Sequence, residues 1–173
     1  SSGNTERQIM IMRDLGTTMQ PLAAFLLNLG LETLALRMER HCSNALRVAE
    51  ALRRDPRVAW VEYPLLPGSG GHALAREYLS KGAAGVVSFG VKGGREAAMR
   101  FLDALRLAAI VVHVADARTG ALHPASTTHR QLTDEQLHAC GITPEQVRLS
   151  VGLEHVDDIL ADLDQALAAS QEG

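Results

Sequence analysis

The sequence lacks the features on which two large classes of partner depend. It carries 17 Lys and Arg against 20 Asp and Glu over 173 residues, a net charge of −3, with no run of basic side chains. Nucleic-acid binding requires such side chains to neutralise phosphates, so we expect no nucleic-acid partner. The longest apolar stretches, such as residues 21–31, are too short to cross a bilayer. We therefore expect one compact domain that binds neither nucleic acid nor membrane.

Cysteine is scarce. CxxC spacing is a usual mark of zinc and redox sites. Cys42 and Cys140 do not have this spacing. Cys42 falls on the apolar face of an expected helix, where an unpaired cysteine packs as a small apolar side chain in the core. Reduced thiols are typical of reducing compartments, so we expect a cytoplasmic location.

Common catalytic motifs are also missing. The seven histidines form no HExxH or HxH pattern, no GxSxG elbow is present, and VKGGR at residues 91–95 lacks the full phosphate-loop pattern. The polar stretch 113–132 contains His123 and His129, which in principle could share a metal ion as part of a hydrolase. The favoured interpretation is a structural, hydrogen-bonded histidine in a loop that satisfies its own backbone.

Hydrophobic periodicity predicts alternating helices and strands. Strands are expected at residues 58–64, 85–91, 108–114 and 147–153. Helices are expected at residues 21–28 (ended by Gly30), 32–54, 72–80, 95–107 and 156–170, with a short helix after the capping box of Thr133 and Gln136. Thr143-Pro144-Glu145-Gln146 repeats the capping logic. This order indicates an α/β fold in which helices cover one sheet.

The long helix at residues 32–54 has a marked apolar face. Its apolar positions are Leu34, Met38, Cys42, Ala45, Ala49 and Leu52. They step by three or four residues, which keeps them on one side. The polar residues, including Asn44, lie off that face.

Arg148 is the residue that physical reasoning singles out. In the expected strand around it, Val147 and Leu149 point to one face, and Arg148 and Ser150 point to the other. An unpaired guanidinium inside an apolar strand is costly to bury. Arg148 therefore either reaches water or an acidic side chain from an edge strand, or it binds a substrate carboxylate with its planar fork.

Several segments together resemble one enzyme family. They are residues 13–52, VEYPLLP at 61–67, FGVKGGREAAMRFLDAL at 89–105, HPASTTHRQL at 123–132 and residues 141–167. In this order they resemble the C-terminal half of the Cys/Met-metabolism PLP enzymes, and among them the O-acetylhomoserine sulfhydrylases. The resemblance covers nearly all of the chain after residue 10.

The resemblance implies the small C-terminal domain of fold-type I, aminotransferase-like enzymes. Such a domain has a small, mainly antiparallel sheet with helices on one side and a long leading helix. We expect residues 1–10 to be a tag remnant or leader, residues 11–54 the leading helices, and residues 55–173 the small α/β domain. The implied reaction is γ-replacement, in which sulfide or a thiol displaces acetate from O-acetylhomoserine.

The resemblance also assigns roles to four residues. Arg148 matches the arginine that binds the substrate α-carboxylate, and Val112 matches a position that lines the pocket. His113 stands where the family has Ser or Asn, and Thr128 lies near the mouth of the site. Two further departures lie close by: Ala115 stands where the family commonly has Gly, and the family commonly has a large apolar residue near Gly120. These changes concentrate at the substrate pocket.

The resemblance places the cofactor-binding residues of the family outside this chain. Neither Lys81 nor Lys92 lies in the context of the lysine that holds pyridoxal 5′-phosphate (PLP). We expect the chain alone to be inactive and to bind PLP weakly or not at all, with PLP held in the complete enzyme. The partners expected are a second copy in a homodimer, a large PLP-binding domain or subunit, and an amino-acid substrate. The alternative is a non-catalytic module that dimerises or binds a partner through its former domain interface.

Overall fold

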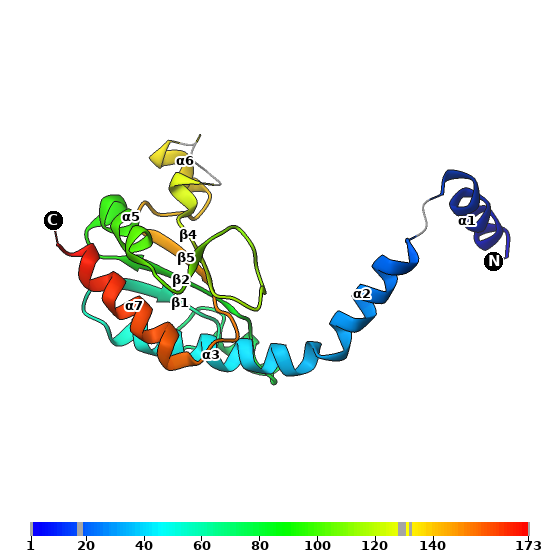
Figure 1. Cartoon of the computed structure of the whole chain (residues 1–173). Coiled ribbons are helices and arrows are strands. Elements are labelled where there is room, and N and C mark those ends of the chain that lie inside the picture. The colour runs from blue at the N-terminus through cyan, green and yellow to red at the C-terminus, as the bar shows by residue number, and fades with distance from the viewer. Residues whose placement is uncertain (1, 17–18, 128–130, 132, 173) are drawn as a thin grey trace. The chain divides into compact units, whose positions relative to one another are not determined.

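The structure is a computed structural model that describes residues 2–16, 19–127, 131 and 133–172 (Figure 1). The helices and strands are α1 (Ser2–Leu15), α2 (Pro21–Glu32), α3 (Leu34–Arg54), β1 (Val58–Glu62), α4 (His72–Tyr78), β2 (Val86–Val91), α5 (Gly94–Ala104), β3 (Ala109–Ile110), β4 (Gly120–Leu122), the 3₁₀ helix η1 (Pro124–Ser126), α6 (Asp134–Ala139), β5 (Gln146–Ser150) and α7 (Val156–Ser170).

The chain forms two compact units, residues 1–35 and 36–173. The first holds α1 and α2, and no residue of α2 is buried. α2 continues through Gly30 and ends at Glu32, with Thr33 as its C-cap, so the expected end at Gly30 is wrong. Gly30 does not adopt the left-handed backbone that ends helices at glycine. No single helix in the described part of the chain is long and apolar enough to cross a membrane.

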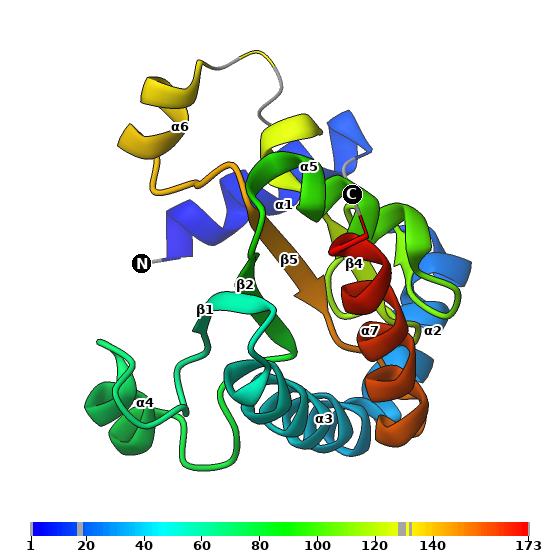
Figure 2. The ribbon, with the colours of Figure 1, turned by 90° about the vertical axis from the view of Figure 1, so that its left-hand side faces the viewer.

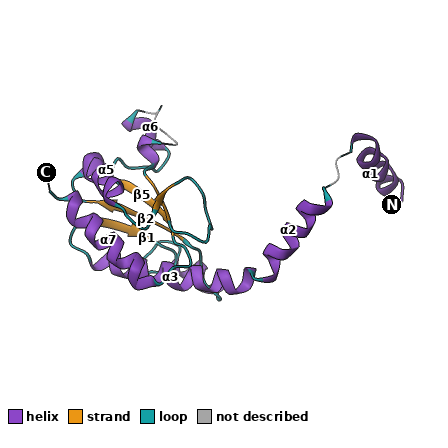
Figure 3. Ribbon diagram, viewed as in Figure 1, coloured by secondary structure: helices purple, strands orange, loops and turns teal. Residues whose placement is uncertain are grey.

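The second unit is built on one five-stranded sheet, in the order β1-β2-β5-β4-β3 (Figure 3). β1 pairs with β2, β2 with β5 and β4 with β5, all antiparallel, whereas β3 pairs with β4 in parallel. The expected α/β fold with a small, mainly antiparallel sheet is confirmed. β5 is the central strand, with β2 and β4 on either side (Figure 2).

Helices α3, α5 and α7 pack against one face of this sheet. The face is formed by alternate apolar residues, among them Phe89 of β2 and Leu149 of β5, both fully buried. Phe89 also meets Phe101 of α5 edge to face, with ring centroids 5.6 Å apart, a preferred aromatic geometry. The expectation of helices on one side is therefore confirmed, and Arg148 lies on the opposite face.

The buried face of α3 differs from the expected one over its first half. Leu34 and Met38 are 39% and 37% exposed, and Cys42 is half-buried, with burial raising the pKa of its thiol. Asn44, expected off the buried face, is 2% exposed. Its amide donates to the carbonyls of Gly152 and Glu154, both at 3.0 Å, which satisfies its polar group in the interior.

Two elements between β3 and β5 were missed or wrongly expected. The expected strand 108–114 shortens to β3, and β4 was not expected because Gly and Ala have weak strand propensity. No helix follows Thr143. Its backbone N–H donates to the Gln146 side chain at 3.3 Å, but Gln146 already begins β5 and pairs with Gly90. Strand pairing thus overrides the capping pattern.

The loop between β3 and β4 contains a strained residue. Ala115 has φ +61°, in the left-handed region, which costs a side-chain-bearing residue about 1–2 kcal/mol. Its backbone N–H donates to the Ser150 hydroxyl at 3.0 Å, which holds this conformation. Glycine would adopt this backbone without that cost.

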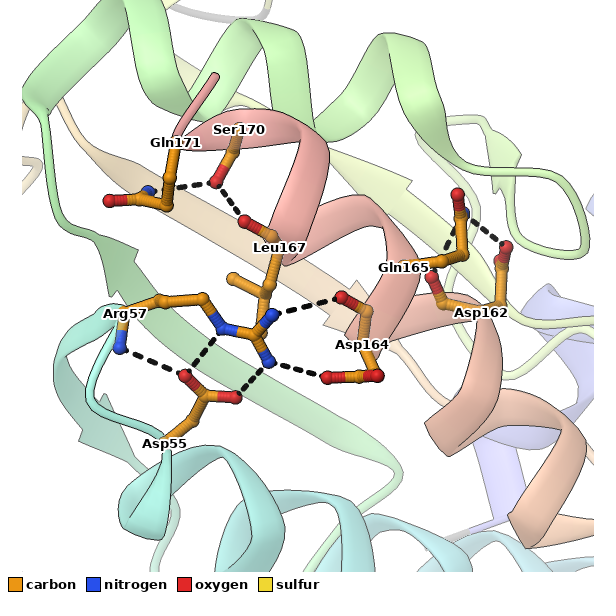
Figure 4. Close-up of polar contacts among 8 residues, drawn as sticks. All are labelled: Asp55, Arg57, Asp162, Asp164, Gln165, Leu167, Ser170 and Gln171. Atoms are coloured by element: carbon orange, nitrogen blue, oxygen red, sulfur yellow. Dashed lines mark hydrogen bonds and ion pairs between the residues drawn. The ribbon is translucent and has the colours of Figure 1, made fainter. Parts of the chain in front are cut away.

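An arginine joins the start of β1 to α7 (Figure 4). The Arg57 guanidinium donates to both carboxylate oxygens of Asp55, at 2.9 and 2.6 Å, and to the Asp164 carboxylate at 2.5 Å. Hydrogen bonds from Arg57 lower the pKa of Asp55 below 3.8. Asp55 is largely buried, whereas the Asp164 side chain is 73% exposed, so the Asp55 pair contributes most of the stabilisation.

Replacing Asp55 with Asn should lower the free energy of unfolding at pH 7 by about 1–2 kcal/mol, because the bidentate charged contact is lost. A carboxyl with a lowered pKa stabilises the fold above its unfolded pKa, and this stabilisation disappears as the pH falls through the folded value. The deficit should therefore be full above about pH 5, shrink as the pH falls below 3.8, and vanish only once the pH has passed the lowered pKa of folded Asp55. Urea unfolding of both proteins at several pH values measures this loss of stability.

Asp103→Asn, at an exposed position, is the control, and its free energy of unfolding should change by no more than about 0.5 kcal/mol. A deficit that does not change with pH would contradict the role of the carboxylate.

Replacing Ala115 with Gly should raise the free energy of unfolding by up to about 1 kcal/mol, since relief of the left-handed strain exceeds the added entropy of the unfolded chain. Ala117 in the same loop has no positive φ, so Ala117→Gly should instead cost about 0.5–1 kcal/mol. Urea unfolding of the two variants side by side provides the measurement. Equal decreases in the free energy of unfolding of Ala115→Gly and Ala117→Gly would show that Ala115 carries no strain.

Candidate functional site

Arg148 lies on the face of the central strand opposite the one against which α3, α5 and α7 pack. Its strand neighbours are Ser88 of β2 and Leu122 of β4. Its Nη2 donates to the carbonyl oxygen of Val112 at 2.8 Å, and in the described part of the chain no carboxylate pairs with it. The interpretation as an edge-strand arginine is therefore wrong, and a half-buried guanidinium without an acidic partner is available to an anion.

The bond to Val112 orients the guanidinium. Because Nη2 is engaged with the backbone carbonyl, the side chain is fixed while its other donors remain for a second acceptor. Arginine presents five N–H donors in a rigid fork that matches the two oxygens of a carboxylate. The arrangement can therefore bind a carboxylate in a defined orientation.

The loop that supplies this carbonyl is anchored to the turn after β5. Glu154 accepts from the backbone N–H of Thr119 at 2.7 Å and from its hydroxyl at 2.9 Å. The Thr119 hydroxyl oxygen in turn accepts from the backbone N–H of Gly152 at 2.9 Å, and Leu153 donates to the Ala117 carbonyl at 2.8 Å. These contacts determine where the Val112 carbonyl lies relative to β5.

Helix α3 holds the same turn from the other side. The Nδ1–H of His41, which is 2% exposed, donates to the Val151 carbonyl at 2.7 Å, and Asn44 donates to the two carbonyls named above. A Cβ on Gly152 would lie 2.5 Å from the Thr119 nitrogen and 2.6 Å from the Ala117 oxygen. Only glycine fits this position, because both obstacles are backbone atoms.

Two of the three other predicted site residues, Val112 and His113, lie in the loop between β3 and β4. Val112 contributes its carbonyl, and its side chain is 58% exposed. The His113 side chain is 68% exposed, and its Nδ1 lies 3.9 Å from the Asp116 carboxylate. At this exposure the pair has a weak interaction. Thr128 lies outside the described residues, so its predicted place at the mouth of the site stays a prediction.

His123 is a structural residue, as the sequence indicates. It is fully buried, its Nε2 donates to the Pro144 carbonyl at 2.7 Å, and its Nδ1 accepts from the Ser126 hydroxyl at 2.8 Å. Burial lowers the pKa of its imidazole, which keeps it neutral near pH 7. His129 lies outside the described residues, and among those that are described no group of three or more metal-binding side chains occurs.

The residues that sequence reasoning missed are those that position Arg148. They are His41, Asn44, Thr119, Ser150 and Glu154. Strand alternation had placed Ser150 on the same face as Arg148, but its partner Ala115 is 35 residues away. No local pattern reports such distant polar contacts.

Comparisons with known proteins identify the family of the chain. The family model of the Cys/Met metabolism PLP-dependent enzymes matches residues 2–168, including residues 2–10. An O-acetyl-L-homoserine sulfhydrylase of Leptospira meyeri is 49% identical over 157 residues, covering 90% of this chain and 36% of that protein. O-acetyl-L-homoserine sulfhydrylase 1 of Thermus thermophilus is 50% identical, covering 91% of this chain and 37% of that protein.

A solved structure supports the same assignment. It comes from Campylobacter jejuni, is described as an O-acetylhomoserine (thiol)-lyase and carries N′-pyridoxyl-lysine-5′-monophosphate. It matches with a TM-score of 0.84 at 43% identity, over 92% of this chain and 38% of that one. The chain thus spans a little over a third of the length of these relatives. The resemblance found in the sequence is confirmed: this chain belongs to the Cys/Met metabolism PLP-dependent enzymes.

Proposed function

We propose that this chain is the substrate-carboxylate-binding part of an O-acetylhomoserine sulfhydrylase-like transferase. The observation that carries the proposal is Arg148: it lies on the central strand, it is oriented by the Val112 carbonyl at 2.8 Å, and no described carboxylate pairs with it. The reaction proposed is γ-replacement, in which sulfide or a thiol displaces acetate from O-acetylhomoserine and yields homocysteine or methionine.

Arg148 has a binding and orienting role in this proposal. Its fork holds the α-carboxylate of the amino acid, which fixes the direction of the rest of the substrate. The side chains of Val112 and His113 follow directly on the loop, and both are exposed, so they are placed to border the bound substrate. Thr128 is proposed to border the same site, from the resemblance alone. Rigid support from β5 and α3 limits the loss of affinity that a loosely held arginine would cause.

The described residues fit the carboxylate end of the substrate and do not fit the cofactor. The chain has two lysines, Lys81 and Lys92, and both are exposed residues in turns. When bound, PLP supplies the electron sink of the reaction. We propose that PLP is held in the complete enzyme by residues of a large domain, which corresponds to the further length of the relatives.

The proposal includes partners and a location. We propose that the complete protein contains a large PLP-binding domain or subunit and forms a homodimer in the cytoplasm. Both cysteines are free thiols, which suits a reducing compartment. A dimeric mass by light scattering supports the homodimer, and a monomeric mass at all concentrations counts against it.

A chimeric enzyme tests the role of Arg148. This chain would replace the matching region of the Thermus thermophilus relative, and homocysteine formation from O-acetylhomoserine and sulfide would be measured. Arg148→Lys should raise KM at least about tenfold, because one charged point contact replaces a bidentate one. Arg76→Lys, on the exposed side of α4, is the matched control and should leave KM unchanged. An unchanged KM in Arg148→Lys would refute the proposed role.

The chain by itself should form no homocysteine and bind PLP weakly or not at all. Mixing the purified chain with PLP and recording the absorbance of an internal aldimine checks this. A stoichiometric aldimine band that disappears on replacing either Lys81 or Lys92 with Ala would contradict the expectation, since it would place the reactive lysine in this chain.

A further inference from the structure

Asp162 of α7 is a buried carboxylate whose oxygens bind the main chain. The residue is 7% exposed. Its Oδ1 accepts from the backbone N–H of Arg106 at 2.8 Å, and its Oδ2 accepts from those of Leu107 at 3.0 Å and Ala108 at 2.9 Å. Burial of a carboxylate is costly unless hydrogen bonds compensate it. Charge-assisted bonds to three consecutive N–H groups provide this compensation and fix the backbone that donates them.

Gln165, one turn further along α7, holds the same stretch of backbone from its other end. Its Nε2 donates to Oδ1 of Asp162 at 3.1 Å (Figure 4) and to the carbonyl of Ala104, the last residue of α5, at 2.7 Å. Residues three apart on a helix lie on the same side of it. The two side chains therefore bind both ends of residues 104–108, which connect α5 to β3.

This connection leads directly to the carbonyl that orients Arg148. β3 follows it at once, and the N–H of Ala109 donates to the Thr119 carbonyl at 3.0 Å. Val112 comes two residues after β3, and its carbonyl accepts from Arg148 at 2.8 Å. Ala108 and Val112 are thus separated by at most about 14 Å of extended chain.

β3 has little means of fixing its own position. It has two residues, lies at the edge of the sheet and pairs with β4 in parallel, and parallel pairing is the less stable kind per residue. A shift of this strand would move the Val112 carbonyl with it. Asp162 holds the start of the strand to α7, a helix whose apolar residues belong to the core.

We propose that Asp162 is a positioning residue of the carboxylate site: it fixes the start of the segment that reaches the Val112 carbonyl, and through that carbonyl it orients the Arg148 guanidinium. Glu154 holds the far end of the same loop through Thr119. An apolar residue at position 162 would avoid the cost of burying a charge but would bind no N–H group. The inference rests on the proposed function only in taking Arg148 to bind the substrate carboxylate.

An isosteric substitution tests the inference without an activity assay. In Asp162→Asn, the amide NH2 faces a main-chain N–H in either orientation, because both carboxylate oxygens accept from such groups. NMR of the isolated chain measures the exchange of the Arg148 Nη hydrogens with water, and the loss of their signal in Arg148→Lys identifies them. Asp162→Asn should make this exchange about fivefold faster, as expected when an ordinary hydrogen bond opens. Asp158→Asn, at an exposed position of α7, is the matched control and should leave the rate unchanged.

A second measurement separates positioning from stability. Leu167→Ala, at a position of α7 that is 1% exposed, removes apolar packing but no hydrogen bond. Asp162→Asn and Leu167→Ala should each lower the midpoint of thermal unfolding by about 5 °C or more. In the chimera with the Thermus thermophilus relative, Asp162→Asn should raise KM for O-acetylhomoserine about fivefold and leave KM for sulfide, which has no carboxylate, unchanged. Leu167→Ala should change neither KM.

An unchanged exchange rate of the Arg148 hydrogens in folded Asp162→Asn overturns the inference. Leu167→Ala overturns it too if it speeds the exchange or raises KM for O-acetylhomoserine as much as Asp162→Asn does, because lost stability would then explain both effects. If Asp162→Asn does not fold, Gln165→Ala takes its place, since it removes the bond to Ala104 and keeps the carboxylate. The same results then decide.

The two proposals fail separately in this design. If Arg148→Lys leaves KM unchanged while Asp162→Asn speeds the exchange, the carboxylate role fails and the positioning of Arg148 by Asp162 stands. If Arg148→Lys raises KM while Asp162→Asn changes neither the exchange nor KM, the positioning fails and the carboxylate role stands.

Discussion

The close approach of three backbone segments at Gly152 is the constraint on which the candidate site depends. The turn after β5, the loop before β4 and the buried face of α3 meet there, and a single Cβ would collide with Thr119 and Ala117. The Glu154 side chain accepts a hydrogen bond from Thr119 of the loop, and Asn44 of α3 donates one to the Glu154 carbonyl. This packing supports the position of Arg148 relative to the Val112 carbonyl, because the loop bonds to Ser150 of β5 through Ala115 and to the turn after β5 through Thr119.

The central place of β5 gives Arg148 its chemical character. On an edge strand its long side chain would reach water freely, whereas between β2 and β4 it is half-buried and flanked on both sides. Helices α3, α5 and α7 pack on the opposite face of the sheet. A guanidinium held in this way loses little conformational entropy when an anion binds, because folding has already ordered the side chain.

Much of the fold follows from the sequence because it is encoded locally. The helices α3, α5 and α7 have strong apolar periodicity, and β2 and β5 are runs of apolar residues between turns. β4 could not be predicted from Gly120-Ala121-Leu122, which becomes a strand only through its neighbours. Thr143 and Gln146 have the residues of a capping box, yet strand pairing determines their structure.

The sequence singles out Arg148 but not the contacts that support it. Arg148 was recognised because an arginine in an apolar strand requires an anion, and the resemblance then gave it a role. His41, Asn44 and Glu154 act over more than 30 residues of sequence, and each is an ordinary polar residue in its own surroundings. The strain at Ala115 is likewise invisible until its backbone angle is known.

The partner of Arg148 is a main-chain oxygen, and this has a consequence for how the protein can change. Every residue at position 112 offers the same carbonyl, so mutation of that side chain leaves the orientation of the arginine intact. The side chains at positions 112 and 113 can therefore change without changing the carbonyl that orients the arginine. The orientation of the guanidinium and the chemistry of the exposed loop surface are separate properties of one short segment, open to independent adaptation.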